Sequence, residues 1–569
     1  MVAALRAAKA SNNGAGGTLL KMVGPAGVQA DDVLLMSVTS RGGTGVTHRV
    51  NHALLARTSI GGNPSNVAIS PDGLYVYSVI GSALKVIRTS DNTVYQTVSV
   101  GGTMNSQVAV NPVSGDIYVA GNNATTVWVV SPSTWTVVAT VTSMTTSGTS
   151  PLLPDPTGAH VYQLSAGTTV KVMRASDNTN VASVTVASLP RSGAWSPDGA
   201  YCYVTSYAVS GVVNVIRRSD HTIVASPAVG QYPLATCMLP DGSKVYVANY
   251  GSGQNTVSVI RTSDNTVVQT VSVGNQPIEL CATPDSAYVY VLHYQSANVQ
   301  VIRTSDNTVV ATITLAQTGG MWMRMSPDGK IVYVSSTSGA NYLHVIRTSD
   351  NTVVVEQSGW AQYLGRTAFT PDSKRAYSQE YTTYVDAFTA DVWTQVGSQV
   401  NSGTDLAQTC WWRVAKATEY ADYGVTLTPT QLASGAIIAG SGLDTAAPAA
   451  GTYGGQANAS SVDDPAPSIG TWSAADGIDV GLFGLAYGSS FTPPTDYTEP
   501  ANGDSASTGT TAATTSEVAY RLLTAATAVG SITATAANAA VNIGHHVFLP
   551  EAQEPEQPNP LPRLLIGGL

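Results

Sequence analysis

The sequence is poor in charge and has no excess of positive charge. Only 11% of its 569 residues are charged, against ~25% in an average soluble protein. Lys and Arg number 26 and Asp and Glu number 36, which gives a net charge of -10. A nucleic-acid-binding protein would show a basic patch. We therefore expect a weakly acidic surface and no nucleic-acid partner.

Long apolar runs are absent as well. No run reaches the ~18 residues that a transmembrane helix needs. The first residues, MVAALRAAKASNNGAGG, lack the apolar core of a signal peptide. These absences predict a chain that folds in a cytoplasm and does not insert into a membrane.

Cysteine is scarce, and the motifs of common enzyme classes are missing. The cysteines stand far apart in alternating apolar segments without a C-x-x-C pair, which predicts buried free thiols and no metal site. No G-x-S-x-G, Walker or H-E-x-x-H motif occurs. We therefore expect no catalytic residues, no metal, no cofactor and no enzymatic activity. The cysteines are Cys202, Cys237, Cys281 and Cys410.

What the sequence does contain is a repeat. Its 53 glycines and 29 prolines are typical of a chain that turns often. The phrase VIRTSDNTV and its degenerate copies lie 42 to 44 residues apart, beginning at Val86, Val129, Val172, Val215, Val259, Val301 and Val345. Pro-containing turns form a second series, at 70–73, 111–115, 155–158, 196–199, 239–242, 283–286, 326–329 and 370–373.

Each repeat predicts four short strands. Ser70–Gly73 suits a type I turn with glycine at its fourth position, and Asp91–Asn92 suits a two-residue hairpin turn. Alternating stretches such as Tyr75–Tyr77 have the period of a strand. Four strands per repeat predict the blade of a β-propeller, so the expected fold class is all-β.

The eight Pro turns predict eight blades, with seven as the alternative. The last unit, Gly365–Phe388, has three clear strands, and segment 52–62 resembles an isolated fourth strand. We expect segment 52–62 to pair beside 384–388, which would leave the propeller without an open edge. Alternatively, segment 385–400 supplies the third and fourth strands of the last blade.

The repeat resembles the YVTN family of β-propellers. The resemblance rests on the SPDG-x-x-x-YV unit followed by V-x-V-I-x-x-x-x-N-T-V, and it covers residues 46–390. It implies the fold. Members of this family include surface proteins, enzymes and binding modules, so the resemblance leaves the function open.

The rest of the chain is not repetitive. Residues 1–45 and 391–549 carry short alternating segments divided by loops, and the simplest arrangement is one β-sandwich interrupted by the propeller. Residues 550–569 are rich in proline, which predicts an extended arm. This arm is either disordered or docked on a neighbouring subunit.

The non-repetitive pieces resemble a β-sandwich module of virion proteins from bacteriophages that infect actinobacteria. The pieces that carry this resemblance are Pro25–Val46, Trp393–Val396, Trp411–Ala415 and Gly435–Asp444. The resemblance implies a virion component, either a tail protein or a capsid accessory protein, that is assembled in the host cytoplasm. Its expected partners are other virion proteins and further copies of this chain.

The loops of the repeat differ between the two ends of the propeller. With strands a to d counted outward from the axis, the a–b and c–d turns are nearly uniform, whereas the b–c and d–a loops vary in length and content. Aromatic residues gather in the variable loops and suit the binding of a sugar or a protein surface, although they also suit the capping of blade edges. These candidate ligand-binding residues are Tyr207, Tyr232, Tyr250, Tyr294, Tyr342, Trp360 and Tyr363.

The repeated arginines offer a second candidate site. They could bind an anion together, but each is followed three residues later by aspartate, so local ion pairs are the simpler interpretation. They are Arg88, Arg174, Arg217, Arg261, Arg303 and Arg347.

Together these patterns predict a virion protein whose sandwich anchors it and whose propeller recognises a host-surface glycan or protein. A purely structural decoration protein and a lyase-like or lactonase-like propeller enzyme are the alternatives. If segment 52–62 closes the last blade, both links to the sandwich leave on the side of the uniform turns. We then expect the sandwich on that side and the variable loops pointing away from it.

Overall fold

The structure is a computed structural model in which all regular elements of the described residues are β-strands. None of these residues forms a helix that is long and apolar enough to span a membrane. Contacts divide the chain into two compact units, Met1–Asn51 with Trp393–Leu569, and His52–Val392. The structure describes residues 54–389 apart from 105–106, 122–125, 143, 145–150, 166, 252, 337–340 and 358–363, and elsewhere it describes the backbone of the strands given below.

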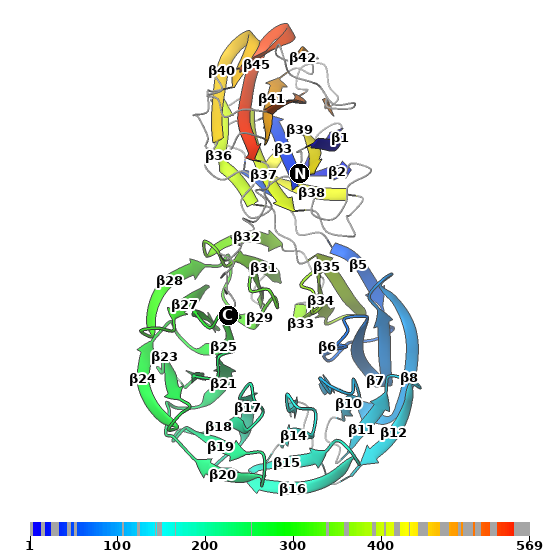
Figure 1. Cartoon of the computed structure of the whole chain (residues 1–569), viewed down its shortest axis with the longest axis vertical. Coiled ribbons are helices and arrows are strands. Elements are labelled where there is room, and N and C mark those ends of the chain that lie inside the picture. Colours follow the sequence, from blue (N-terminus) through cyan, green and yellow to red (C-terminus); the bar gives the residue numbers. More distant parts are fainter. Residues whose placement is uncertain are drawn as a thin grey trace, which may run out of the picture. The chain divides into compact units, whose positions relative to one another are not determined.

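The unit His52–Val392 is an eight-bladed β-propeller (Figure 1). The first four blades are β6 (Val67–Ile69), β7 (Tyr75–Arg88) and β8 (Thr93–Met104); β9 (Gln107–Val110), β10 (Ile117–Ala120), β11 (Val127–Ser131) and β12 (Thr136–Val141); β13 (Leu152–Pro154), β14 (His160–Leu164), β15 (Thr169–Arg174) and β16 (Thr179–Thr185); and β17 (Pro190–Trp195), β18 (Tyr201–Ser206), β19 (Val212–Arg217) and β20 (Thr222–Ala225). In the first blade, β7 supplies two strands, because its first half pairs with β6 and its second half with β8.

The remaining blades follow the same order. They are β21 (Pro233–Met238), β22 (Lys244–Asn249), β23 (Thr256–Arg261) and β24 (Thr266–Ser272); β25 (Pro277–Ala282), β26 (Tyr288–His293), β27 (Asn298–Arg303) and β28 (Thr308–Thr314); β29 (Gly320–Met325), β30 (Ile331–Ser336), β31 (Tyr342–Arg347) and β32 (Thr352–Gln357); and β33 (Leu364–Phe369), β34 (Arg375–Glu380), β35 (Tyr384–Thr389) and β5 (Leu54–Ser59).

The predicted closure of the propeller is confirmed. Strand β5 pairs with β35, with Ser59 opposite Tyr384 and Leu54 opposite Phe388. The fourth strand of the last blade therefore comes from the beginning of the propeller sequence, which rules out segment 385–400 in that role. Arg375 lies opposite Thr389, so β35 ends on the side of the a–b turns.

The core of the propeller lies between neighbouring blades. Each b strand is covered on both faces, and all six residues of β30 are buried. The d strands alternate between exposed and covered residues, as β28 does, because only one of their faces meets the next blade. Eight tyrosines at one repeat position are fully buried: Tyr77, Tyr118, Tyr162, Tyr203, Tyr246, Tyr290, Tyr333 and Tyr377.

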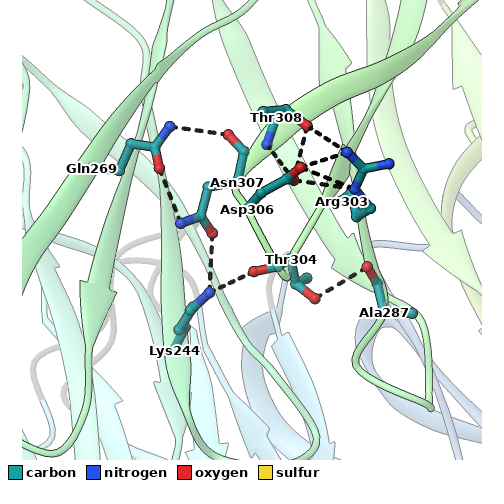
Figure 2. Close-up of polar contacts among 8 residues, drawn as sticks. All are labelled: Lys244, Gln269, Ala287, Arg303, Thr304, Asp306, Asn307 and Thr308. Atoms are coloured by element: carbon teal, nitrogen blue, oxygen red, sulfur yellow. Dashed lines mark hydrogen bonds and ion pairs between the residues drawn. The ribbon is translucent and has the colours of Figure 1, made fainter.

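The tyrosine that recurs in each blade joins that blade to the turn of the next in several places. The hydroxyl of Tyr246 donates to Oδ1 of Asn307 over 2.6 Å, and Tyr377 donates to Asn92 over 2.7 Å across the closure. Asn307 also exchanges hydrogen bonds with Gln269 and accepts one from Lys244 (Figure 2). The tyrosine and asparagine of the repeat are therefore contact residues between blades.

The c–d turn differs from the prediction. Arg88 pairs with Thr93, so the connection has four residues rather than two, and the N–H of Asn92 donates to the carbonyl of Arg88. Only Asn92 has a positive φ, of 56°. The a–b turn agrees with the sequence, because Gly73 has a φ of 73° and its N–H donates to the carbonyl of Ser70.

The other unit joins both ends of the chain in shared sheets. Strand β3 lies between β37 and β39, so a strand from before the propeller pairs with two strands from after it. Strand β4, within the range that the sequence assigned to the repeat region, pairs with β38. One sheet has the order β1-β39-β3-β37-β36, a second β2-β38-β4, and a third β40-β45-β41-β44-β43 with β42 beside β45. These strands are β1 (Ala4–Asn12), β2 (Gly17–Val23), β3 (Val33–Arg41), β4 (Thr47–Val50), β36 (Thr394–Ser402), β37 (Leu406–Val414), β38 (Asp422–Gln431), β39 (Ala433–Ser441), β40 (Tyr453–Ala466), β41 (Gly477–Ala486), β42 (Phe491–Thr492), β43 (Ser505–Ala506), β44 (Thr514–Leu523) and β45 (Ile532–Pro550). The arm beyond Pro550 lies outside the described residues.

Candidate functional site

The candidate site is a cavity on the propeller axis, at the end that bears the variable loops. Its volume is about 760 Å³, within the range of small-molecule sites. The walls are mainly the first halves of the a strands, which follow the d–a loops, and the b–c loops contribute Tyr250, Tyr294 and Tyr381. All lining residues belong to the propeller.

Two of the predicted tyrosines line this cavity. Tyr250 and Tyr294 follow directly after the b strands β22 and β26. Burial raises the pKa of Tyr250, with smaller contributions from Tyr207 and Tyr294, which places the three phenols near one another. Tyr294 is 39% exposed, so its ring is open to a ligand.

Tyr207 and Tyr232 form an aromatic pair in the loops of the fourth and fifth blades. Their ring centres are 5.0 Å apart, and the Arg191 guanidinium lies 5.2 Å from the centre of the Tyr207 ring. The N–H of Tyr232 donates to the carbonyl of Ala208, which joins the two loops. Tyr232 has a φ of 50°, and Gln276 has the same conformation in the next d–a loop. The positive φ is therefore a feature of these loops and not of Tyr232 alone.

The other predicted aromatic residues are Tyr342, Trp360 and Tyr363. Tyr342 stacks on the ring of His344, with ring centres 5.4 Å apart, and does not line the cavity. Burial lowers the pKa of His344, so its imidazole is neutral at pH 7. Trp360 and Tyr363 lie outside the described residues.

The charged residues of the cavity wall were not predicted from the sequence. Arg191, Glu279, Arg324 and Arg366 stand on four different a strands and face one cavity. An Nη1 of Arg324 donates to Oε1 of Glu279 over 2.7 Å, and the Arg366 guanidinium lies 4.3 Å from the centre of the Trp322 ring. The available signal was a charged residue within an otherwise small or apolar inner strand, as in GMWMRM and LGRTAF.

The repeated arginines do not form a shared anion site. Each pairs with the aspartate three residues later, as the simpler interpretation predicted, and each aspartate also accepts from the threonine that follows the turn, as in Arg303, Asp306 and Thr308 (Figure 2). The pairs are Arg88–Asp91, Arg174–Asp177, Arg217–Asp220, Arg261–Asp264, Arg303–Asp306 and Arg347–Asp350.

The cysteines match their prediction only in part. Cys202 is a buried free thiol, but Cys237 and Cys281 are only half-buried because they stand on the inner strands. Burial within the propeller nevertheless raises the pKa of Cys237 to about 12, so this thiol is protonated at neutral pH. The side chain of Cys410 lies outside the described residues. Among the described residues, no group of three or more His, Cys, Asp and Glu side chains could hold a metal ion.

Comparisons with known proteins identify no family for this chain. No protein-family profile matches the chain, and no curated protein matches it. Among solved structures, the chain is similar to hydrazine synthase from Kuenenia stuttgartiensis, with 17% sequence identity and a TM-score of 0.40. The alignment covers 60% of this chain and 96% of that chain, and at this similarity nothing follows about activity.

Proposed function

We propose that this chain is a structural protein of a bacteriophage virion whose propeller recognises a glycan or protein on the host surface. In this proposal the strands outside the propeller form a split β-sandwich that anchors the chain to other virion proteins. The propeller acts by binding and carries out no catalysis.

The asymmetry of the propeller carries the recognition part of the proposal. At one end the a–b and c–d turns repeat with little change, and the arginine at each c–d turn pairs with the aspartate three residues later, as Arg303 does with Asp306. At the other end the loops vary, and Tyr250 and Tyr294 stand beside an axial cavity. Tyrosine suits recognition because its rigid ring gives a large contact area with a polar tip.

The anchoring part rests on the resemblance of the non-repetitive pieces to a virion module. Strands β3, β36, β37 and β39 overlap the four pieces that carry this resemblance, and they share one five-stranded sheet. Segments separated by the whole propeller are thus brought into one sheet, as an interrupted domain requires.

One strand offers a matched pair of variants that tests recognition. Tyr288 begins β26 at the end of the uniform turns and is 38% exposed, whereas Tyr294 follows β26 at the cavity and is 39% exposed. We expect Tyr294→Ser to weaken binding of the full chain to actinobacterial cell envelopes by about tenfold, a typical loss for an aromatic contact residue. We expect Tyr288→Ser to leave binding unchanged.

The same assays separate the alternatives. Equal binding by both variants would contradict recognition through this end and would favour a decoration protein. Release of soluble sugar from the envelopes, or turnover of a lactone, would contradict a non-catalytic propeller. Antibodies against the chain should label phage particles in electron micrographs, and unlabelled particles would contradict the virion assignment.

A further inference from the structure

The axial cavity carries positive charge in a protein that is negative as a whole. Three arginines and one glutamate line it, namely Arg191, Arg324, Arg366 and Glu279, and the described part of the chain contributes no Lys, Asp or His to the wall. The full chain has a net charge of -10. This excess of positive charge lies at the one place where the inner strands of several blades meet.

Arg324 is only partly satisfied within the protein. Its Nη1 donates to Oε1 of Glu279 and to the carbonyl of Met323. Its Nε and Nη2 have no hydrogen-bond acceptor among the described residues. The side chain of Arg324 is 36% exposed while that of Glu279 is 17% exposed, so the guanidinium, more than the carboxylate, faces the cavity.

Arg366 is the less compensated of the two cations. The Arg366 guanidinium lies over the face of the Trp322 ring. Within the described part of the chain this guanidinium makes neither a hydrogen bond nor an ion pair. Burial and, to a smaller extent, the neighbouring charge of Arg324 lower the pKa of Arg366 to about 10 against the opposing effect of Glu279, and Arg366 remains charged at pH 7. A half-buried charge that makes no ion pair destabilises the protein. Such an arrangement is typical of a functional site.

We infer that this cavity binds a sugar unit bearing a carboxylate group, with the carboxylate on Arg324 and Arg366. An arginine presents N–H groups in a planar fork that matches the two oxygens of a carboxylate. The rest of the sugar extends toward the loop end, where Tyr250 and Tyr294 offer aromatic faces. This inference rests on the proposal that the propeller is a binding module, and it adds the class of ligand.

The test compares two sugars that differ only in the relevant group. The full chain is titrated by calorimetry with glucuronate and with glucose, which share the ring and differ in carboxylate against hydroxymethyl. We expect glucuronate to bind at least about tenfold more tightly than glucose at low salt, and the preference to shrink at high salt because salt screens the charges. Oligosaccharides that end in glucuronate form a further arm and distinguish a glycan from a free sugar acid.

Variants assign the binding to named residues. Arg366→Gln should weaken glucuronate binding by about tenfold or more, a usual loss for a charged hydrogen bond, and it should still fold because it removes a charge without a counterion. Glu279→Gln removes the competing carboxylate and should strengthen binding. Arg303→Gln, on the uniform turns, is the control and should change nothing.

Equal affinity for the two sugars, absence of glucuronate binding, or unchanged binding by Arg366→Gln would each overturn the inference. These failures can be told apart from failure of the proposed function. If Tyr294→Ser still weakens binding to cell envelopes while glucuronate does not bind, the recognition proposal stands and the carboxylate specificity is wrong.

Discussion

Two adjacent residues of the c–d turn, the aspartate and the asparagine, stabilise different contacts. The aspartate, as in Asp306, pairs with an exposed arginine and orients the turn through Thr308. The asparagine, as in Asn307, is 8% exposed and accepts from the buried Tyr246 of the preceding blade. Exposed ion pairs contribute little to stability, whereas a buried donor without an acceptor costs substantially more. The asparagine is therefore the stabilising member of the turn.

We expect Asn307→Ala to lower the free energy of unfolding by about 2 to 4 kcal/mol, because the Tyr246 hydroxyl loses its acceptor and alanine is disfavoured at positive φ. Asn307→Gly should lower it less, since glycine tolerates the φ of 54°. Denaturant unfolding measures both. Arg303→Ala is the control, and a loss as large as that of Asn307→Ala would contradict this assignment.

At the scale of elements, strand β5 closes the propeller with an arginine between two buried acids. Arg57 lies 3.1 Å from Oδ1 of Asp386 on β35 and 3.2 Å from Oε2 of Glu380 on β34. Both carboxylates are almost fully buried, and Oδ2 of Asp386 has no hydrogen-bond partner among the described residues. Burial raises the pKa of Asp386 to about 6 despite the opposing effect of Arg57.

This raised pKa makes the closure sensitive to pH. The folded state favours the protonated acid, so the contribution of Asp386 to stability is full below about pH 4 and is lost as the pH rises through about 6. Asp386→Asn keeps an acceptor for Arg57 and removes the charge. We expect Asp386→Asn to stabilise the protein by about 3 kcal/mol at pH 7, which is the free energy that corresponds to raising the pKa of Asp386 to about 6. At pH 4 we expect little effect. Thermal melts of both proteins across this range measure the difference, and a pH-independent gap would contradict the assignment.

At the scale of the whole molecule, the propeller is a closed unit whose two ends are neighbours. Leu54 lies opposite Phe388 in the last blade, so the chain enters and leaves at the same place. Adjacent ends are what the insertion of one domain into another requires. They lie on the side of the a–b turns, as the sequence analysis predicted, whereas the expected position of the other unit on that side stays a prediction.

We expect a fragment of residues 52–392 to fold as a monomer with one cooperative melting transition, because it contains all four strands of each blade. A fragment of residues 63–392 lacks β5, which exposes the edge of β35 and leaves Asp386 and Glu380 without Arg57. It should melt at a lower temperature and self-associate, since open strand edges pair with other chains. Size-exclusion chromatography compares the two fragments, and identical behaviour would show that the closure is dispensable.

Much of the propeller could be predicted from the sequence because its signals are local. The Pro turns mark each blade and the alternation of residues sets the strands within it, so eight blades were predicted, while the pairing of β5 with β35 removed the alternative of segment 385–400. The c–d turn was predicted too short, since Asp91–Asn92 suits a two-residue turn in isolation while the pairing of Arg88 with Thr93 sets a four-residue connection. The loop tyrosines were found because they depart from a repeat that is otherwise regular.

The charged cavity was decided by the tertiary structure. Arg324 and Arg366 lie 42 positions apart on separate inner strands. In the sequence, each is a single charged residue within a short strand, with nothing to link the two. Only the packing of the blades around one axis brings these strands together, where three guanidinium groups and one carboxylate share a cavity. By itself the sequence determined the strand pattern of the blades and the uneven character of their loops, because periodicity and turn chemistry act over a few residues, whereas the structure decided between eight blades and seven. The cavity and its charge depend on strands from different blades meeting at the axis, and that meeting exists only in the folded protein.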